Sequence, residues 1–185
     1  LWGRLIAEMA GEDLPVMPVD HPLTFFGPFD GFAGTGKEIG YPLLRDQGNS
    51  AYLRDTGDPT TAEGGQIEWG YYEEHNPRLV HPRDLLEKEQ ARLSPSQRDL
   101  DLEQVMEPLE RAMELTPILG ELGYNESHSF NGLLQVTADG GPSMGESQKV
   151  RGLWYAVAIW VKDGPGMGKL IADWMTDGRT EIDHN

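Results

Sequence analysis

The stretch that decides the fold is residues 14–26, LPVMPVDHPLTFF. It is apolar, rich in residues that favour strands and edged by prolines, so it predicts one or two extended strands. Further strand-like segments follow at residues 41–45, 51–54 and 66–72, and the glycine, aspartate, asparagine and proline residues between them favour turns. Together these segments predict an antiparallel meander.

Helical spacing marks the segments on either side of the meander. Apolar residues within residues 1–11 share one face, which predicts the end of an amphipathic helix closed by its final glycine. Residues 102–113 repeat leucine, valine and methionine at the same spacing, and Pro108 should kink or split that helix. Residues 115–123 predict a second, short helix. The polar residues 73–98 predict loops with short helical turns.

The last third of the chain predicts a strand, a glycine loop and a helix. Residues 129–137 favour a strand, and the continuous apolar run LWYAVAIWV at 153–161 is typical of a strand buried on both faces. The glycine-rich run GPGMG at 164–168 predicts a loop, followed by a helix over residues 169–176. The expected class is therefore α+β, with a mixed, largely antiparallel sheet and helices.

Composition excludes several classes of function. The 185 residues include 15 Lys and Arg against 31 Asp and Glu, for a net charge of −16. This balance argues against binding to nucleic acid and against a polybasic membrane anchor, and no apolar run approaches the ~20 residues of a membrane span. The chain has no cysteine, which rules out disulfides, thiolate metal sites and cysteine nucleophiles. A cytoplasmic location is expected.

The first residue is Leu1 rather than methionine, and the chain starts inside a helical pattern with no signal peptide. We therefore expect a fragment of a longer chain.

Two motifs suggest chemistry but have ordinary alternatives. Residues 31–38, GFAGTGKE, have the G-x4-G-K spacing of a phosphate loop, but Glu38 stands where magnesium binding needs Ser or Thr. A flexible surface loop is the favoured interpretation. The five histidines form no HExxH motif or i,i+4 pair, so no metal site is expected. His21 differs from the others because it sits in an apolar strand, where an imidazole needs a partner.

The C-terminal glycines form the strongest local signal. Gly164, Gly166 and Gly168 would let the backbone approach a ligand, and the following helix would point amide N–H groups toward it. A carbonyl oxygen, a phosphate or an anionic ring would suit that place. The alternative is a turn that serves only packing.

Six motifs in the same order resemble the dimethylglycine and sarcosine dehydrogenase/oxidase branch of the D-amino-acid-oxidase-like flavoproteins. They are WGRLIAEMAG at 2–11, LPVMPVDH at 14–21, LRD with AYLR at 44–46 and 51–54, WGYYE at 69–73, FNG through TADGGPSMGE at 130–146, and the terminal helix and tail at 161–183. The resemblance covers nearly all of the chain.

This resemblance implies a large antiparallel sheet that covers FAD and an activity on an N-methylated glycine such as dimethylglycine or sarcosine. The family reaction transfers a hydride from the N-methyl carbon to flavin N5. Residues 1–128 would form the substrate-binding (cap) portion and residues 129–185 the flavin-contacting portion. The G-x-G-x-x-G unit that holds the ADP part of FAD is not in this sequence, so an N-terminal FAD-binding half is an expected partner. In several relatives a folate-binding domain follows.

The resemblance also assigns residues to roles. His21 and Tyr52 match positions near the substrate, where they could take or relay the ammonium proton. Lys162 could pair with a substrate carboxylate or could be a solvated loop charge. The flavin contacts are two sets, the covering loop at Pro142, Met144 and Gly145 and the turn beside the pyrimidine end at Gly164, Gly166 and Gly168.

The sequence is also compatible with two other interpretations. The chain could be a non-catalytic regulatory or interaction subunit that keeps the fold, or a small acidic binding module. An upstream dinucleotide motif and a flavin spectrum that bleaches with substrate would favour the enzyme.

Overall fold

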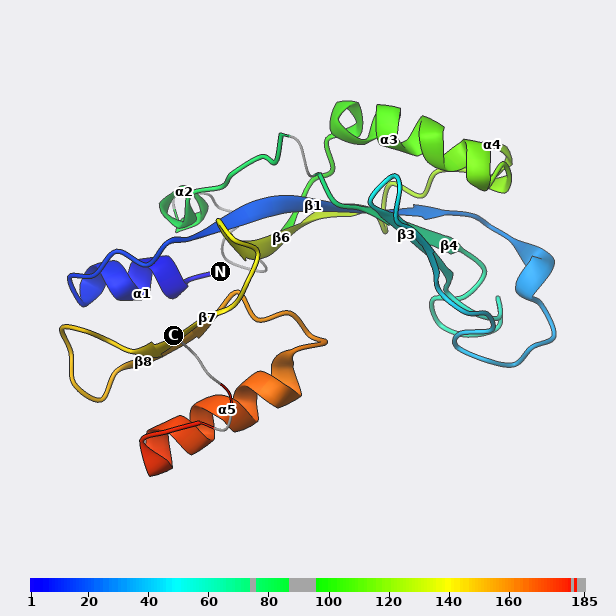
Figure 1. The fold of residues 1–185 in the computed structure, drawn as a ribbon. Helices are drawn as coiled ribbons and strands as arrows, with labels where there is room; N and C mark the ends of the chain where they lie inside the picture. Colours follow the sequence, from blue (N-terminus) through cyan, green and yellow to red (C-terminus); the bar gives the residue numbers. More distant parts are fainter. Residues whose placement is uncertain (74–75, 87–95, 181, 183–185) are drawn as a thin grey trace. The chain divides into compact units, whose positions relative to one another are not determined.

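The computed structural model describes residues 1–73, 76–86, 96–180 and 182. Its helices are α1 (Gly3–Met9), α2 (Pro82–Leu86), α3 (Leu102–Leu115), α4 (Ile118–Glu121) and α5 (Gly164–Asp177), with a 3-10 turn η1 at Asp30–Phe32. Its strands are β1 (Val16–Phe26), β2 (Leu44–Asp46), β3 (Ala51–Asp55), β4 (Ile67–Tyr71), β5 (Gln97–Arg98), β6 (Phe130–Thr137), β7 (Ser143–Glu146) and β8 (Trp154–Val157). This mixture of helices and mostly antiparallel strands confirms the expected α+β class (Figure 1).

The strands form two sheets. Six strands lie in the order β2-β3-β4-β1-β6-β5, and β7 pairs with β8. The chain divides into a first unit, residues 1–19, 79–91 and 133–185, and a second unit, residues 20–78 and 92–132. The expected division at residue 128 concerns function, so it stays a prediction. Of the loops expected over 73–98, residues 74–75 and 87–95 lie outside the described residues, as does Asp183 of the tail motif.

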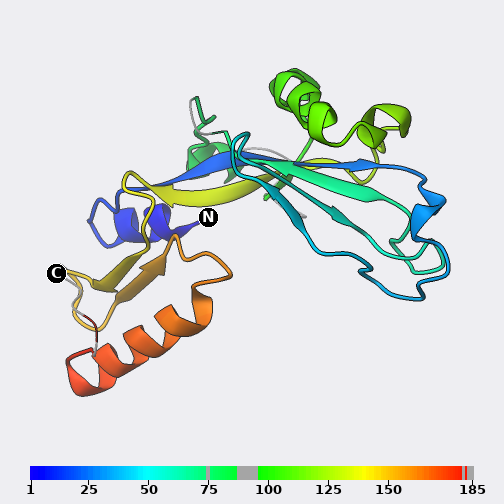
Figure 2. The same cartoon turned by 45° about the vertical axis from the view of Figure 1, so that its right-hand side comes forward.

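The second unit contains the predicted meander. β2, β3 and β4 pair antiparallel in chain order, and β4 pairs with β1. One face of this sheet carries the core, in which Trp69 is completely buried. Figures 1 and 2 show α3 and α4 over that face, and Val105, Leu109 and Leu119 pack into the core. The opposite face is left for polar and aromatic side chains.

Pro108 lies inside a continuous helix rather than splitting it. Helix α3 runs from Leu102 to Leu115, and the Asp101 carboxylate caps it by accepting from the Glu103 amide at 3.1 Å. A proline in a helix interior loses one backbone hydrogen bond. Here Pro108 is buried beside Val105 and Leu109, so apolar burial offsets that loss and the predicted split does not occur.

In the loop at residues 31–38, the Gly36 amide is hydrogen-bonded within the protein. The Gly36 amide donates to a carboxylate oxygen of Asp58 at 2.8 Å, and Thr60 donates to the same side chain at 2.7 Å. These bonds hold the pKa of Asp58 down to about 2. A carboxylate therefore stands where a phosphate would be held, and the loop is a surface segment of the second unit that hydrogen bonds tie to Asp58.

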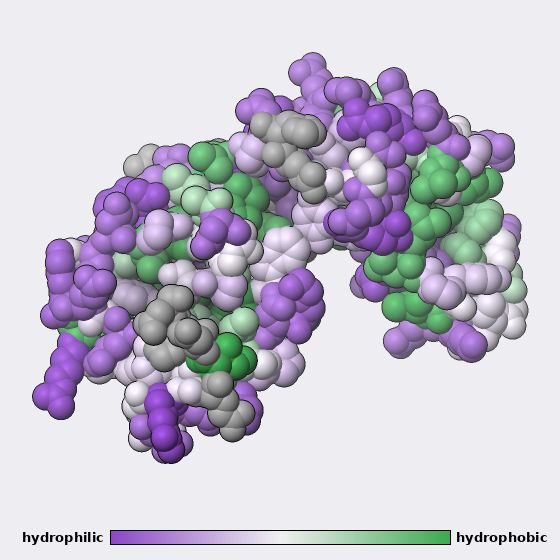
Figure 3. Space-filling model, viewed as in Figure 1, coloured by the Kyte–Doolittle hydropathy of each residue, from purple (hydrophilic) through white to green (hydrophobic). Residues whose placement is uncertain are grey.

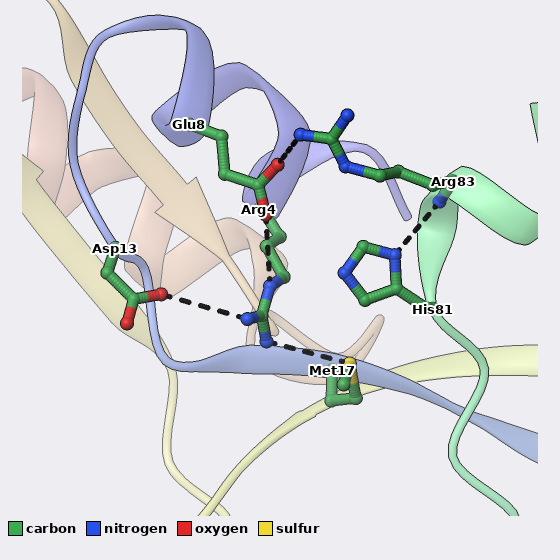
Figure 4. A network of polar contacts seen from close by, with 6 residues as sticks. All are labelled: Arg4, Glu8, Asp13, Met17, His81 and Arg83. Atoms are coloured by element: carbon green, nitrogen blue, oxygen red, sulfur yellow. Dashed lines mark hydrogen bonds and ion pairs between the residues drawn. The ribbon is translucent and has the colours of Figure 1, made fainter.

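Ion pairs link α1 and α2 within the first unit (Figure 4). Glu8 accepts from Arg83 at 2.5 Å and from Arg4 at 3.4 Å, and Arg4 also faces Asp13 at 3.9 Å. The His81 imidazole accepts from the Arg83 amide at 3.2 Å, which accounts for that histidine as a local turn contact.

The apolar run at 153–161 forms a much shorter strand than expected. β8 ends at Val157, since Ala158 adopts φ of 55°, in the left-handed region that interrupts a strand. Tyr155 is buried with Leu14 and Val16, whereas Val161 is 96% exposed. The prediction of a strand buried on both faces is therefore wrong. Figure 3 shows hydrophilic side chains over much of the surface, as the net charge requires, with apolar patches in both units.

Candidate active site

His21 and Tyr52 meet although 31 residues separate them in the chain. Nε2 of His21 lies 3.1 Å from the Tyr52 hydroxyl oxygen. β1 carries the histidine and β3 the tyrosine, and β4 lies between the two strands in the sheet. The tyrosine side chain must therefore reach across a whole strand to make this contact.

Gly70 is what lets the tyrosine cross. On β4 it stands directly opposite both Tyr52 of β3 and Leu23 of β1. A Cβ at this glycine would come within 2.1 Å of Cζ of Tyr52, so the phenol ring lies flat against the backbone of β4. Glycine inside a strand commonly marks such a close approach. Every other side chain here would push the ring away from His21.

Tyr72 completes an aromatic cluster; it lies in the family motif at 69–73, but sequence reasoning assigned it no role in the site. Its ring stacks on His21 with centroids 4.4 Å apart and lies 5.6 Å from the Tyr52 ring. The guanidinium of Arg45 lies over the same ring, 4.9 Å from its centroid. Tyr72 follows Gly70 by two positions, so strand alternation could have placed it on the same face.

The cluster keeps both members of the pair neutral near pH 7. Burial lowers the pKa of His21 to about 4, against a backbone hydrogen bond with Tyr71 that acts to raise it, and the nearby charge of Arg45 lowers it further. Burial also raises the pKa of Tyr52 above its ordinary value. A neutral imidazole can accept a proton from the phenol hydroxyl at Nε2, and the phenol oxygen can accept one from a ligand.

A buried ion pair continues the same face. Arg54 Nε donates to the Glu68 carboxylate at 2.8 Å, and Nη2 lies 2.6 Å from the same oxygen. The Glu68 side chain is only 7% exposed, so the arginine neutralises a charge that would otherwise be buried alone. Leu23, Arg54 and Glu68 line a cavity of about 420 Å³.

The predicted flavin-covering residues lie in the first unit. Pro142 ends a turn, and Met144 and Gly145 lie on β7 opposite Ala156 and Tyr155 of β8. Gly145 has φ of 149°, and the Trp174 ring of α5 lies 3.6 Å from the place of its missing Cβ. Glycine is needed here for its backbone conformation.

The three C-terminal glycines do not form a loop. Helix α5 begins at Gly164, so Gly166 and Gly168 belong to its first turns, and the predicted glycine loop is corrected to a helix N-terminus. Extra Cβ atoms at the three glycines would meet nothing within 4 Å. The N-cap residue Asp163 makes no side-chain hydrogen bond to the helix. An open, uncapped N-terminus fits the electron-rich pyrimidine end of a flavin.

Lys162 is paired within the protein. Its Nζ lies 2.7 Å from the Asp163 carboxylate and 5.8 Å from the Trp160 ring centroid, and its side chain is 70% exposed. This geometry matches the solvated loop charge that sequence reasoning gave as the alternative. The structure brings His21 and Tyr52 together in the second unit, and it places Lys162 and the flavin positions in the first.

Comparison with known proteins now identifies the family. Residues 1–174 match the family described as DAO, FAD dependent oxidoreductase. The chain belongs to this family. Human mitochondrial dimethylglycine dehydrogenase is 26% identical over 98% of the chain, and human mitochondrial sarcosine dehydrogenase is 25% identical over 99% of it. The chain spans about a fifth of these relatives, 20% and 18% of their lengths.

Solved structures show the same fold. Glycine oxidase from Geobacillus kaustophilus matches 98% of the chain and 41% of its own with a TM-score of 0.64 and 20% identity. L-proline dehydrogenase from P. horikoshii matches 98% of the chain and 42% of its own with a TM-score of 0.64 and 19% identity. The family assignment confirms FAD as the cofactor of this fold, and the open N-terminus of α5 is compatible with it.

The cytoplasmic location predicted from composition is wrong on this comparison, because the related dimethylglycine and sarcosine dehydrogenases are mitochondrial. Within the described residues, no helix is long and apolar enough to cross a membrane. The same residues contain no group of three or more histidine and acidic side chains that could hold a metal ion.

Proposed function

We propose that this chain is the substrate-side portion of an FAD-dependent oxidoreductase that oxidises an N-methylated glycine, such as dimethylglycine or sarcosine. The single observation that carries the proposal is the His21–Tyr52 pair, half-buried, neutral and aimed across Gly70. The relatives whose names state those substrates align along nearly the whole chain.

The chemistry requires an unprotonated amine. When bound, the flavin accepts the hydride that leaves the carbon next to nitrogen, and the nitrogen lone pair forms the new C=N bond. An amine that carries a proton has no such lone pair. His21 is neutral near pH 7, so its Nε2 can accept a hydrogen bond from the Tyr52 hydroxyl, and the Tyr52 oxygen can in turn accept one from the amine and relay its proton.

The first unit supplies backbone rather than side-chain chemistry in this proposal. Met144 and Gly145 on β7 would cover the isoalloxazine, and the N-terminus of α5 at Gly164 would face its pyrimidine end. Amide N–H groups at a helix N-terminus stabilise negative charge. The dinucleotide-binding portion is proposed as a further partner, and a folate-binding domain as a downstream one.

The test is a visible absorption spectrum of the intact protein, before and after anaerobic addition of dimethylglycine or sarcosine. Flavin bands that bleach with either amine would support the proposal. Trimethylglycine is the matched control, because it keeps the carboxylate but its nitrogen has no lone pair to release, so it should leave the bands unchanged. Absence of flavin bands in the intact protein would contradict the proposal and favour a non-catalytic subunit.

Variants of the pair separate catalysis from structure. We expect His21→Gln and Tyr52→Phe each to lower turnover by roughly 10²–10⁴-fold, the usual contribution of a positioned acid or base, while flavin content is retained. The controls His81→Gln and Tyr41→Phe remove the same groups at exposed places and should keep turnover. Equal loss of turnover and flavin in the His21 variant would mean that this histidine is structural.

A further inference from the structure

An arginine stands beside the His21–Tyr52 pair on the same face of the sheet. Arg45 of β2 is directly opposite Tyr52 of β3 in the strand register. Directly opposed residues have Cβ atoms about 5 Å apart and project to the same side. The Arg45 guanidinium lies over the Tyr72 ring, and that ring also stacks on His21.

The guanidinium of Arg45 keeps most of its donors for a ligand. Nε donates to the side-chain oxygen of Gln47 at 3.1 Å, which orients the group and leaves the two terminal amino groups. In the described part of the chain, no carboxylate lies within ion-pair distance of it. By contrast, Arg54 is engaged with Glu68 and Lys162 with Asp163.

The charge of Arg45 also acts on the pair it faces. After burial, its field is one of the forces that lower the pKa of His21. A cation next to a proton-accepting histidine is unfavourable for the ammonium form of a bound amine. An anion brought by the ligand would offset that repulsion, and a planar fork binds a carboxylate with two parallel hydrogen bonds.

We propose that Arg45, steadied on the Tyr72 ring, binds the carboxylate of the substrate while His21 and Tyr52 hold its nitrogen. A glycine-type amine carries its nitrogen and its carboxylate on one carbon, so one molecule can present both groups to this aromatic cluster at once. The site therefore selects amino acids over amines that lack the carboxylate. This inference rests on the proposed function, and it moves the carboxylate-binding role from Lys162 to Arg45.

The first test compares two amines in steady-state kinetics of the intact protein. In Arg45→Gln we expect the KM for dimethylglycine to rise roughly 10–100-fold, the effect of losing a charge-assisted contact. The values for N,N-dimethylethylamine, which has no carboxylate, should change less than about threefold. Arg45→Lys should fall between, because it keeps the charge without the fork. Arg111→Gln, which removes an exposed arginine of α3, is the control.

The second test measures binding without turnover. Methoxyacetate has an ether oxygen in place of the sarcosine nitrogen, so it presents the carboxylate but cannot be oxidised as an amine. Titration of the intact protein, followed by the flavin absorbance, should give a weaker Kd in Arg45→Gln and Tyr72→Leu and an unchanged one in Arg111→Gln.

Two outcomes overturn the proposal. Unchanged KM and unchanged methoxyacetate binding in Arg45→Gln would show that the arginine does not touch the carboxylate. Equal losses with both amines would show that it only supports the fold. If the unsubstituted protein oxidises neither amine, the proposed function fails, whereas the methoxyacetate titration still reports whether Arg45 binds a carboxylate.

Discussion

The two units differ in how much core packing supports their candidate site residues. In the second unit, side chains on one sheet face are fixed by a core on the other face, where the described cluster has ten buried residues, Trp69 among them. In the first unit, the core cluster has five buried residues, and α5 buries none of its own. The titratable side chains of the candidate site therefore lie on a sheet whose backbone is held by a core on its other face. The first unit contributes backbone amides and glycines instead.

The largest expected effect comes from a glycine-to-alanine substitution in the second unit. Gly70→Ala places a Cβ within 2.1 Å of the Tyr52 ring, so the ring must swing out and the contact with His21 is lost. We expect a loss of about 1–3 kcal/mol in the free energy of unfolding, as for other overpacked sites, together with the turnover defect of Tyr52→Phe. Urea unfolding and steady-state kinetics measure the two effects.

Gly166→Ala is the matched substitution in the first unit. The added methyl group meets nothing within 4 Å, and the residue has ordinary helical surroundings. The free energy of unfolding should rise by about 0.4–1 kcal/mol, because alanine fits this helical backbone and restricts the unfolded chain more than glycine does. If both variants lost equal stability, the contrast between a supported sheet face and an open helix end would be wrong.

The pH dependence of stability tests the same sheet face through His21. The folded pKa of His21 is about 4, below the ordinary value of 6.5, so unfolded chains bind the proton more readily. The contribution of the neutral imidazole to the free energy of unfolding is fully present above pH 6.5 and is lost as pH falls toward 4. The loss is about 3 kcal/mol when complete. Thermal unfolding between pH 4 and 7.5 should show a steeper acid decline in the unsubstituted protein than in His21→Gln. Parallel declines would contradict the half-buried, neutral imidazole.

Lys162 should give the smallest effect. Its pair with Asp163 is solvent-exposed, and such pairs contribute about 0–1 kcal/mol. Lys162→Met should leave both the free energy of unfolding and the KM for dimethylglycine nearly unchanged. A rise in KM as large as that of Arg45→Gln would instead return the carboxylate-binding role to the lysine.

Periodicity predicted most of the elements but not where the C-terminal ones begin and end. The run at 153–161 is apolar throughout, and nothing in its composition shows that the left-handed backbone at Ala158 ends β8. Pro108 shows the same limit, because the low helix propensity of proline predicted a break in the helix there. Burial against Val105 and Leu109 decides otherwise, because tertiary packing outweighs one lost hydrogen bond.

The candidate site was only partly visible in the sequence. His21 stood out as a polar residue in an apolar strand, and family resemblance pointed to Tyr52. Gly70, Tyr72 and Arg45 lie in the family motifs but received no role, because their importance depends on which strands are neighbours. A glycine opposite a tyrosine becomes meaningful only once the register of β3 and β4 is known.

The sequence by itself determined the class of fold, the antiparallel meander and the family, since these follow from local pattern and from motifs in order. Only the tertiary structure decided which side chains meet. The His21–Tyr52 contact joins residues on strands that are not adjacent, and it exists because β4 presents a glycine between them. Such a contact depends on strand order and register, which are set by burial of the opposite face rather than by the residues that make the contact.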